Sequence, residues 1–267
     1  MSFKKLAATI SYVTSLSWIC RRCDKKEQDS DSNEDLTGLA KYLPYAGCVI
    51  GLFLAVLAWG VLRISHFEEH LLAGTLLATV WLIITGGLHM DGLMDTADGV
   101  YSHQTKERML EIMQDSRVGN FGVLAGISIL LLKIFSLAAL AKNPLILLSL
   151  LLFVPVAARF CDLFTIAFFN YAKKEGKGKI WHDSTNIPGD LIFGLVPVVG
   201  LALFLSIYSH PTIVLIAFGS ALVSGITLAF KLNSILGGQT GDTYGATVEI
   251  SETGALLVSA LLLPALS

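Results

Sequence analysis

The sequence predicts an all-α membrane protein, a polytopic bundle of about seven transmembrane helices with a cytoplasmic N-terminus. Its 267 residues have a mean hydropathy of +0.66, and 15% of them are charged. Soluble domains carry roughly 25% charged residues, so the chain has too little polar surface for a water-exposed globule. Several apolar runs approach the ~20 residues that a helix needs to cross a bilayer. With a net charge of −2, the chain is not expected to bind nucleic acid.

The chain begins with two segments that are not expected to span the membrane. Residues 1–23 include apolar side chains at helical spacing with Lys4 and Lys5 at one end, which is typical of an amphipathic helix at the membrane surface. Residues 24–40 are nearly all polar with mixed charge, which indicates a linker. We therefore expect residues 41–267 to form a single transmembrane catalytic domain in contact with the lipid bilayer.

Seven apolar runs are the expected spans, and basic residues orient them. The runs lie near 44–62, 71–90, 121–141, 144–169, 190–208, 212–231 and 250–266. With the N-terminus in the cytosol, the cytosolic segments hold fourteen lysines and arginines, whereas the outside loops hold only Arg63 and Lys142. Cytoplasmic loops carry the basic excess, so this orientation is favoured. It places every motif described below on the cytosolic side.

The strongest local motif is G-G-L-H-M-D-G-L-M-D-T-A-D-G at residues 86–99, at the cytosolic end of the second span. If that helix continues, Asp91, Asp95 and Asp98 lie at about 0°, 40° and −20° around its axis. Like charges one turn apart repel each other, and this stripe contains no lysine or arginine. We therefore predict that the three aspartates hold Mg²⁺, which also leaves positions for substrate phosphates. The alternative is an ordinary solvated helix end.

The segment R-M-L-E-I-M-Q-D-S-R-V-G at residues 108–119 carries two further candidates. Asp115 is placed to complete the metal cluster or to act as a general base. Arg117 is placed to meet a phosphate. A surface helix with mixed charge explains these residues equally well.

Arg159 lies roughly 15 Å deep in the fourth span, at 1.5 Å per residue. A guanidinium at that depth is costly unless it is paired or faces a polar cavity. We predict that it faces a substrate phosphate. The alternative is a structural pair with Asp162, one helical turn away. Lys133 also lies within a span, and the sequence suggests no partner for it.

Two loops have compositions that suit a polyphosphate. The loop at residues 170–179 is basic, and its Lys173 and Lys174 are candidates for binding substrate phosphates. A loop that only sets membrane topology fits it equally well.

The second loop, L-G-G-Q-T-G-D-T-Y-G-A at residues 236–246, is rich in glycine. Backbone N–H groups in such loops cradle phosphate. The candidates for this role are Gly237, Gly238, Thr240 and Gly241. A glycine-rich turn between two spans is the alternative, but it does not explain why Asp242, Glu249 and Glu252 gather at a membrane entrance.

At these residues the sequence resembles the cobalamin synthase family, the adenosylcobinamide-GDP ribazoletransferases. The motifs at 86–99, 108–119 and 237–246 stand in the family's order and spacing, and the resemblance runs from about Lys41 to the C-terminus. The stretch from Tyr12 to Arg22 departs from the usual family N-terminus. The resemblance implies a magnesium enzyme of the bacterial cytoplasmic (inner) membrane with its active site facing the cytosol. A homo-oligomer, or a complex with other enzymes of the cobalamin pathway, stays open.

The reaction implied by the resemblance joins adenosylcobinamide-GDP to α-ribazole or its 5′-phosphate and releases GMP. A ribose hydroxyl would attack the phosphorus on the cobinamide side, and Mg²⁺ would neutralise charge on the leaving group. The predicted roles are Asp91, Asp95 and Asp98 as metal ligands, Asp115 or Asp242 as general base, and Arg117 and Arg159 as phosphate-binding residues.

Two other function classes are alternatives to this one. A CDP-alcohol phosphotransferase also uses clustered aspartates, but its pattern has alanine-arginine soon after its second aspartate-glycine element, where this chain has V-Y-S-H after Asp98-Gly99. A cation transporter needs acids deep within its spans and often an internal duplication. The acids of this chain are expected mainly at one membrane face, which favours an enzyme.

Overall fold

The computed structural model describes residues 2–15, 36–64, 70–208 and 211–263, and the named elements in these ranges are all helices. The predicted all-α class is therefore confirmed. The elements are α1 (Phe3–Val13), the 3-10 helix η2 (Ala40–Tyr42), α3 (Leu43–Ile64), α4 (His70–Ile84), α5 (Leu88–Tyr101), α6 (Lys106–Ile112), α7 (Asn120–Leu140), α8 (Pro144–Phe168), α9 (Lys177–Ser184), α10 (Gly189–Tyr208), α11 (Pro211–Leu236) and α12 (Gly241–Leu262).

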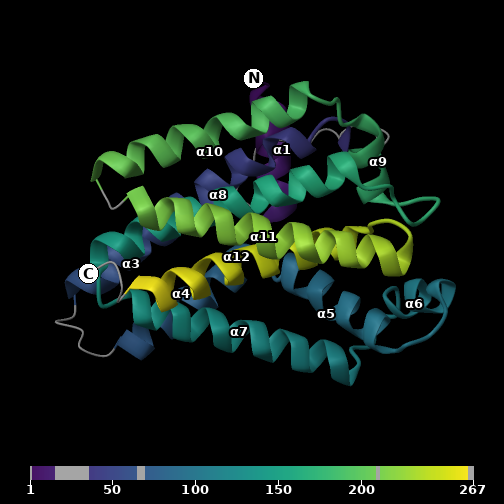
Figure 1. Ribbon diagram of the computed structural model, residues 1–267, viewed down its shortest axis with the longest axis horizontal. Coiled ribbons are helices and arrows are strands. Elements are labelled where there is room, and N and C mark those ends of the chain that lie inside the picture. The colour runs from purple at the N-terminus through teal and green to yellow at the C-terminus, as the bar shows by residue number, and fades with distance from the viewer. Residues whose placement is uncertain (1, 16–35, 65–69, 209–210, 264–267) are drawn as a thin grey trace, which may run out of the picture.

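Six of these helices are long and apolar enough to cross a membrane: α3, α7, α8, α10, α11 and α12. A seventh candidate is the bent pair formed by α4 and α5. The long helices run along the long axis of the molecule, as Figure 1 shows for α7, α8, α10 and α11. The prediction of about seven spans agrees with this arrangement.

The expected second span, 71–90, is not one straight helix. Helix α4 ends at Ile84, and α5 begins at Leu88 at an angle of 89° to it. The chain turns at Gly86 and Gly87, whose φ angles of +62° and +71° lie in the left-handed region that glycine adopts without strain. Because of this turn, the helix that carries the aspartates leaves the line of its span.

The expected last span, 250–266, begins too late. Helix α12 starts at Gly241, because Thr240 and Thr243 form a reciprocal capping box at its N-terminus. The polar residues in its first half lower its mean hydropathy to 1.3. A search for apolar runs therefore does not include this first half in the span. As a result, Glu249 and Glu252 lie within a helix of the bundle and not at its entrance.

Helix α8 is the central helix of the bundle. Of its most apolar 18-residue window, 78% is buried, the largest share among the candidate spans of the described residues. Many of its apolar side chains, such as Leu150 and Phe153, are completely buried. The same helix carries Arg159 and Asp162, which are 0% and 3% exposed, toward the end that bears the site.

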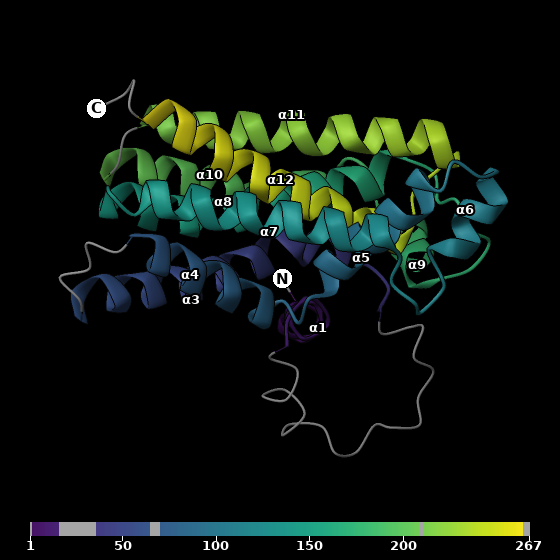
Figure 2. The ribbon, with the colours of Figure 1, turned by 90° about the horizontal axis from the view of Figure 1, so that it is seen from below.

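The N-terminal helix α1 lies across the long helices. In Figure 2 it is seen nearly end-on while α7, α8 and α11 run across the view. It is amphipathic: Phe3 is 83% exposed, whereas Thr9 and Val13 are buried. The last part of the predicted linker 24–40 is also packed, since Leu39 and Ala40 are each 1% exposed, and residues 24–35 lie outside the described residues.

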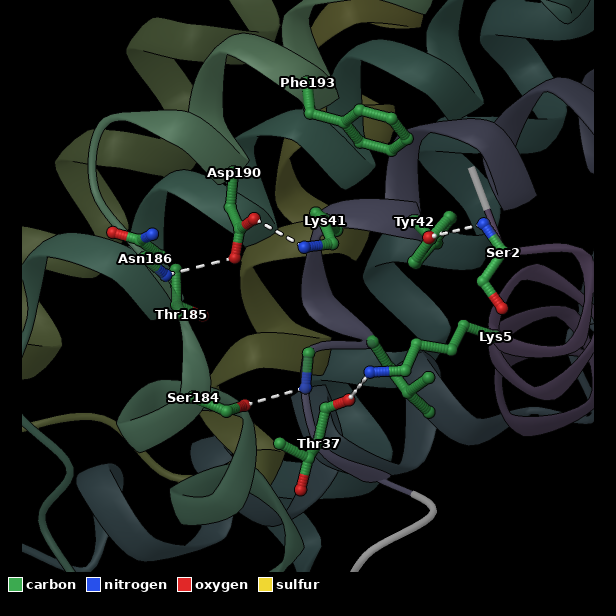
Figure 3. A network of polar contacts seen from close by, with 12 residues as sticks. Ser2, Lys5, Thr37, Lys41, Tyr42, Ser184, Thr185, Asn186, Asp190 and Phe193 are labelled. Carbon is green, nitrogen blue, oxygen red and sulfur yellow. Dashed lines mark hydrogen bonds and ion pairs between the residues drawn. The ribbon is translucent and has the colours of Figure 1, made fainter.

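Polar contacts tie this N-terminal region to the end of α9 and the start of α10 (Figure 3). The Gly38 N–H donates to Ser184 Oγ (2.9 Å), and Lys41 Nζ donates to Asp190 Oδ1 (2.8 Å). Within the N-terminal region, Lys5 Nζ of α1 donates to Thr37 O (2.9 Å). Helices α1 and α9 are thus linked to each other through the segments that flank them.

Candidate active site at one end of the bundle

The segments that carry the sequence motifs gather at one end of the bundle. Figure 1 shows α5, α6 and α9 toward the end opposite to the C-terminus. The loop before α9 meets the glycine-rich turn before α12, since Tyr171 and Gln239 form an isolated bridge. Motifs that lie far apart in the sequence therefore form one region.

Helix α5 carries the aspartate stripe, because it is helical through all three aspartates. Their surroundings differ: Asp91 is exposed, Asp95 is half-buried and Asp98 is buried. The carboxylate of Asp95 interacts electrostatically with Asp91, Asp98 and Asp242, and with the ammonium group of Lys173. Four carboxylates and one lysine thus share this end of the bundle.

Asp242 reaches the stripe because α12 packs closely against α5. A Cβ atom on Gly92 would lie only 2.6 Å from the backbone oxygen of Asp242, so only glycine allows this approach. The side chain of Asp242 accepts from Lys173 Nζ and from Thr240 Oγ1, at 3.3 Å each. These contacts hold the Asp242 carboxylate beside the stripe.

Asp98 has a structural role that the sequence did not indicate. Its carboxylate oxygens accept hydrogen bonds from the backbone N–H groups of Gly119 (2.7 Å) and Gly122 (2.8 Å), at the start of α7. It thereby satisfies two of the N–H groups that a helix N-terminus leaves unpaired. Among the described residues, no group of three or more His, Cys, Asp or Glu side chains is arranged to hold one metal ion.

We expect Gly122→Ala to destabilise the protein by about 1–3 kcal/mol, as overpacking does. The added Cβ would lie 2.4 Å from Oδ2 of Asp98 and would push the carboxylate off α7. Gly200→Ala in α10 is the matched control, because a Cβ there meets no atom within 4 Å. Thermal unfolding of both variants in one detergent makes the comparison, and equal stabilities would contradict the capping role of Asp98.

Arg159 does not pair with Asp162, and it does not reach a surface. Its guanidinium donates to Glu252 of α12, and it is 0% exposed. The structure therefore assigns Arg159 to a buried ion network and not to a phosphate-binding surface. The sequence does contain a signal for this pairing. Two basic residues within spans, Lys133 and Arg159, match two acidic residues one helical turn apart in α12, and buried charges in a membrane usually pair.

Lys133 belongs to the same network, which corrects the expectation that it has no partner. Its ammonium group donates to Glu249 (2.6 Å) and to Glu252, and it lies 5.0 Å from the ring centroid of Trp81. Glu249 and Glu252 are 3% and 0% exposed. The network joins α7, α8 and α12.

Asp115 and Arg117 lie in the exposed loop between α6 and α7. They pair with each other at 2.7 Å, and the Arg117 side chain is 87% exposed. Hydrogen bonds from Arg117 lower the pKa of Asp115 to about 2. A general base works best with a pKa near the operating pH, so this pairing disfavours Asp115 as the base. The guanidinium of Arg117 remains accessible to a ligand.

The two loops predicted to bind phosphate are joined to each other by backbone hydrogen bonds. Gln239 donates its N–H to Asn170 O and accepts from the Ala172 N–H, both at 2.7 Å. A Cβ on Gly238 would lie 2.7 Å from Asn170 O, so Gly238 allows this pairing. The predicted phosphate cradle is thus replaced, at Gly238 and at the capping residue Thr240, by internal contacts.

The other predicted loop residues are more open. Gly241 and Lys174 are exposed, and Lys173 lies beside Asp242. Gly237 is exposed, and a Cβ there would lie 2.6 Å from the ammonium group of Lys106, a residue that the sequence reasoning did not single out. This part of the site therefore combines lysine ammonium groups with exposed backbone.

A small cavity opens beside the stripe. It has a volume of about 140 Å³ and is bounded by α1, α5, α8, α9 and α12. Its polar lining includes Asp91, Asp162, Asp242 and His89, and its aromatic lining is Tyr12, Trp181 and Tyr244. The sequence reasoning missed most of these residues, because single residues from five helices form no local pattern. We call this cavity the acidic pocket.

Comparison with known proteins gives a consistent result. The chain matches the cobalamin-5-phosphate synthase family over residues 5–260. It is 41% identical to an adenosylcobinamide-GDP ribazoletransferase from Thermosynechococcus vestitus over 227 residues, which is 84% of this chain and 86% of the relative. It is 37% identical to one from Desulfitobacterium hafniense, over 96% of both chains. No solved structure matches the chain significantly. With three motifs in one site and a match that covers nearly the whole sequence, the chain belongs to the cobalamin-5-phosphate synthase family.

Proposed function

We propose that this chain, an adenosylcobinamide-GDP ribazoletransferase of cobalamin nucleotide-loop assembly, performs its reaction at the acidic pocket and the aspartate stripe. The substrates would be adenosylcobinamide-GDP and α-ribazole or its 5′-phosphate, and GMP would be released. The observation that carries the proposal is the gathering of Asp91, Asp95 and Asp242 with Lys173 at one end of the bundle. This combination suits a diphosphate and its counter-charges.

The donor set at this end fits a divalent cation. Asp91 and Asp95 offer hard oxygen ligands, and the acids around Asp95 outnumber the one lysine that it interacts with. Mg²⁺ is usually bound through one or two carboxylates together with substrate phosphates, so a complete protein cage is not required. Asp91 and Asp95 would hold the ion, while Asp98 caps α7. When bound, Mg²⁺ supplies charge that stabilises the leaving phosphate.

The residues of the chain account for the remaining steps. Lys173 and the exposed Arg117 would bind nonbridging phosphate oxygens. A hydroxyl oxygen of the acceptor forms a bond to the phosphorus on the cobinamide side, and the bond from this phosphorus to the oxygen of GMP breaks. The hydroxyl proton passes to a carboxylate. Asp242 is the proposed acceptor of this proton, because it lines the acidic pocket and Asp115 is tied to Arg117.

An assay of the purified protein tests the proposal directly. Adenosylcobinamide-GDP, α-ribazole and Mg²⁺ are incubated with the protein in detergent, and GMP release is followed. We expect GMP to appear in equal amount to the corrinoid product. GMP formation that does not depend on α-ribazole would indicate hydrolysis and would contradict the transferase proposal.

We also propose that the N-terminus and the site face the cytosol of a bacterium, with the chain in its cytoplasmic membrane. The basic bias of the sequence supports this orientation. In a variant without native cysteines, a cysteine at Glu175, in the exposed loop before α9, should resist a membrane-impermeant thiol reagent in intact cells. A cysteine at Lys142, in the exposed turn between α7 and α8, should react. The opposite labelling would mean that the orientation is reversed.

A further inference from the structure

Four residues that line the acidic pocket carry a buried polar atom without a hydrogen-bond partner among the described residues. The atoms are His89 Nδ1, Asp162 Oδ1, Trp181 Nε1 and Tyr244 Oη. All four side chains are 3–5% exposed. An unpaired buried polar atom is costly, and four of those in the described part of the chain surround this one small cavity. This clustering indicates a ligand that supplies the missing partners.

The volume of the pocket limits that ligand to one ring. A cavity of about 150 Å³ is known to hold a benzene molecule, and the acidic pocket measures about 140 Å³. A whole nucleotide does not fit. The rings of Tyr12 and Trp181, with centroids 5.0 Å apart and planes inclined by 55°, provide an aromatic part of the wall.

The chemistry of the lining limits the ligand further. The indole N–H of Trp181 only donates, whereas the unpaired Oδ1 of Asp162 is a carboxyl oxygen that can accept. A ligand that satisfies both must carry an acceptor and a donor within one ring's reach, as vicinal hydroxyl groups do. Asp91 and Asp242 line the same pocket, so a hydroxylated ring there lies beside the proposed reaction centre.

We propose that the acidic pocket binds the ribose ring of the acceptor nucleoside. Asp162 accepts a hydrogen bond from one ribose hydroxyl, and Trp181 and Tyr244 donate to its oxygens. This inference rests on the proposed function, which it deepens by assigning the acceptor subsite. Arg159, the partner predicted for Asp162, binds Glu252 instead. The inference therefore assigns Asp162 to recognition of the acceptor.

The N-terminal helix is part of this subsite. Tyr12 and Val13 of α1 line the pocket, and Tyr12 packs on Trp181 of α9. The polar contacts in Figure 3 hold the segments next to these two helices together. The stretch that departs from the usual family pattern thus begins at the pocket wall.

Equilibrium binding of radiolabelled α-ribazole to the purified protein tests the inference. Asp162→Asn and Tyr244→Phe keep the shape of the pocket and change one polar group each, and Trp181→Phe removes the indole N–H together with part of the ring. We expect each variant to bind α-ribazole about tenfold more weakly, which is typical of one lost hydrogen bond in a buried site. Tyr208→Phe, an exposed tyrosine at the end of α10, is the control and should bind like the wild type.

Steady-state kinetics separates recognition from a merely structural role. In the pocket variants, KM for α-ribazole should rise about tenfold, whereas KM for adenosylcobinamide-GDP and the thermal midpoint should stay unchanged. The free base of the nucleoside should not compete for the subsite. Equal competition by the free base, or wild-type α-ribazole binding and KM in all three variants, would overturn the ribose assignment.

The two proposals fail in different ways. If the wild type releases GMP but the pocket variants behave like it, the transferase proposal stands and the subsite is wrong. If α-ribazole binding weakens in the variants but the wild type forms no GMP, the subsite stands and the proposed reaction is wrong.

Discussion

Asp91→Asn and Asp95→Asn should each lower kcat by about 10²–10³-fold while the protein still inserts and folds. Loss of a group that stabilises transition-state charge has effects of this size. Each substitution keeps the shape of the side chain but removes a charge from the end of the bundle where Mg²⁺ is proposed to bind. Neither carboxylate joins two helices as the carboxylate of Asp98 does, so folding should not change.

The measurement is GMP release at several Mg²⁺ concentrations, with thermal unfolding of each variant beside it. Wild-type activity should disappear in excess chelator and return with Mg²⁺ or Mn²⁺. Glu107→Gln in the exposed helix α6 is the control for removing an acid at the same end, and it should keep full activity. Full activity of both aspartate variants would rule out the proposed metal ligands.

Arg159→Leu should destabilise the protein by about 3–5 kcal/mol, the usual result of breaking a buried ion pair. The change leaves the two buried glutamates with Lys133 as their only cation partner in the network. The double variant Arg159→Leu/Glu252→Leu should recover most of this loss. It removes one charge of each sign and keeps the pair between Lys133 and Glu249, whose atoms lie 2.6 Å apart.

A second double variant makes the test specific. Arg159→Leu/Asp162→Leu should remain as unstable as the single variant, because Arg159 does not pair with Asp162. Arg108→Leu, which breaks an exposed pair with Glu111, should change stability by no more than about 1 kcal/mol. Chemical or thermal unfolding in one detergent gives all four values. Equal recovery in the two double variants would contradict the assignment of Glu252 as the partner.

The sequence was sufficient for the properties that depend on local pattern. Composition and apolar runs determined the membrane class and the approximate number of spans, because a bilayer requires long apolar helices. The stripe of Asp91, Asp95 and Asp98 was also correct, since helical periodicity alone places them on one face. The three motifs were sufficient to indicate the family, and the comparison bears this out.

Local pattern was insufficient where a side chain has possible partners both in its own helix and in another helix. Arg159 was assigned to a phosphate or to Asp162, the nearest acid in its own helix, but Glu252 lies 93 positions away and is its partner. Asp98 was grouped with the other aspartates, but the start of α7 takes its carboxylate. Neither choice is visible in a single helix, because hydrogen bonds and ion pairs form between whichever groups the packing brings together.

The sequence by itself determined that this protein is a membrane-spanning helix bundle with three aspartates on one helix within residues 86–99. The tertiary structure alone decided that the chain turns by 89° at Gly86 and Gly87, and that α1, α8, α9 and α12 join α5 around one pocket. The physical reason is that hydropathy and periodicity act within a segment. A pocket depends on contacts between segments, and the packing of the whole bundle sets those contacts.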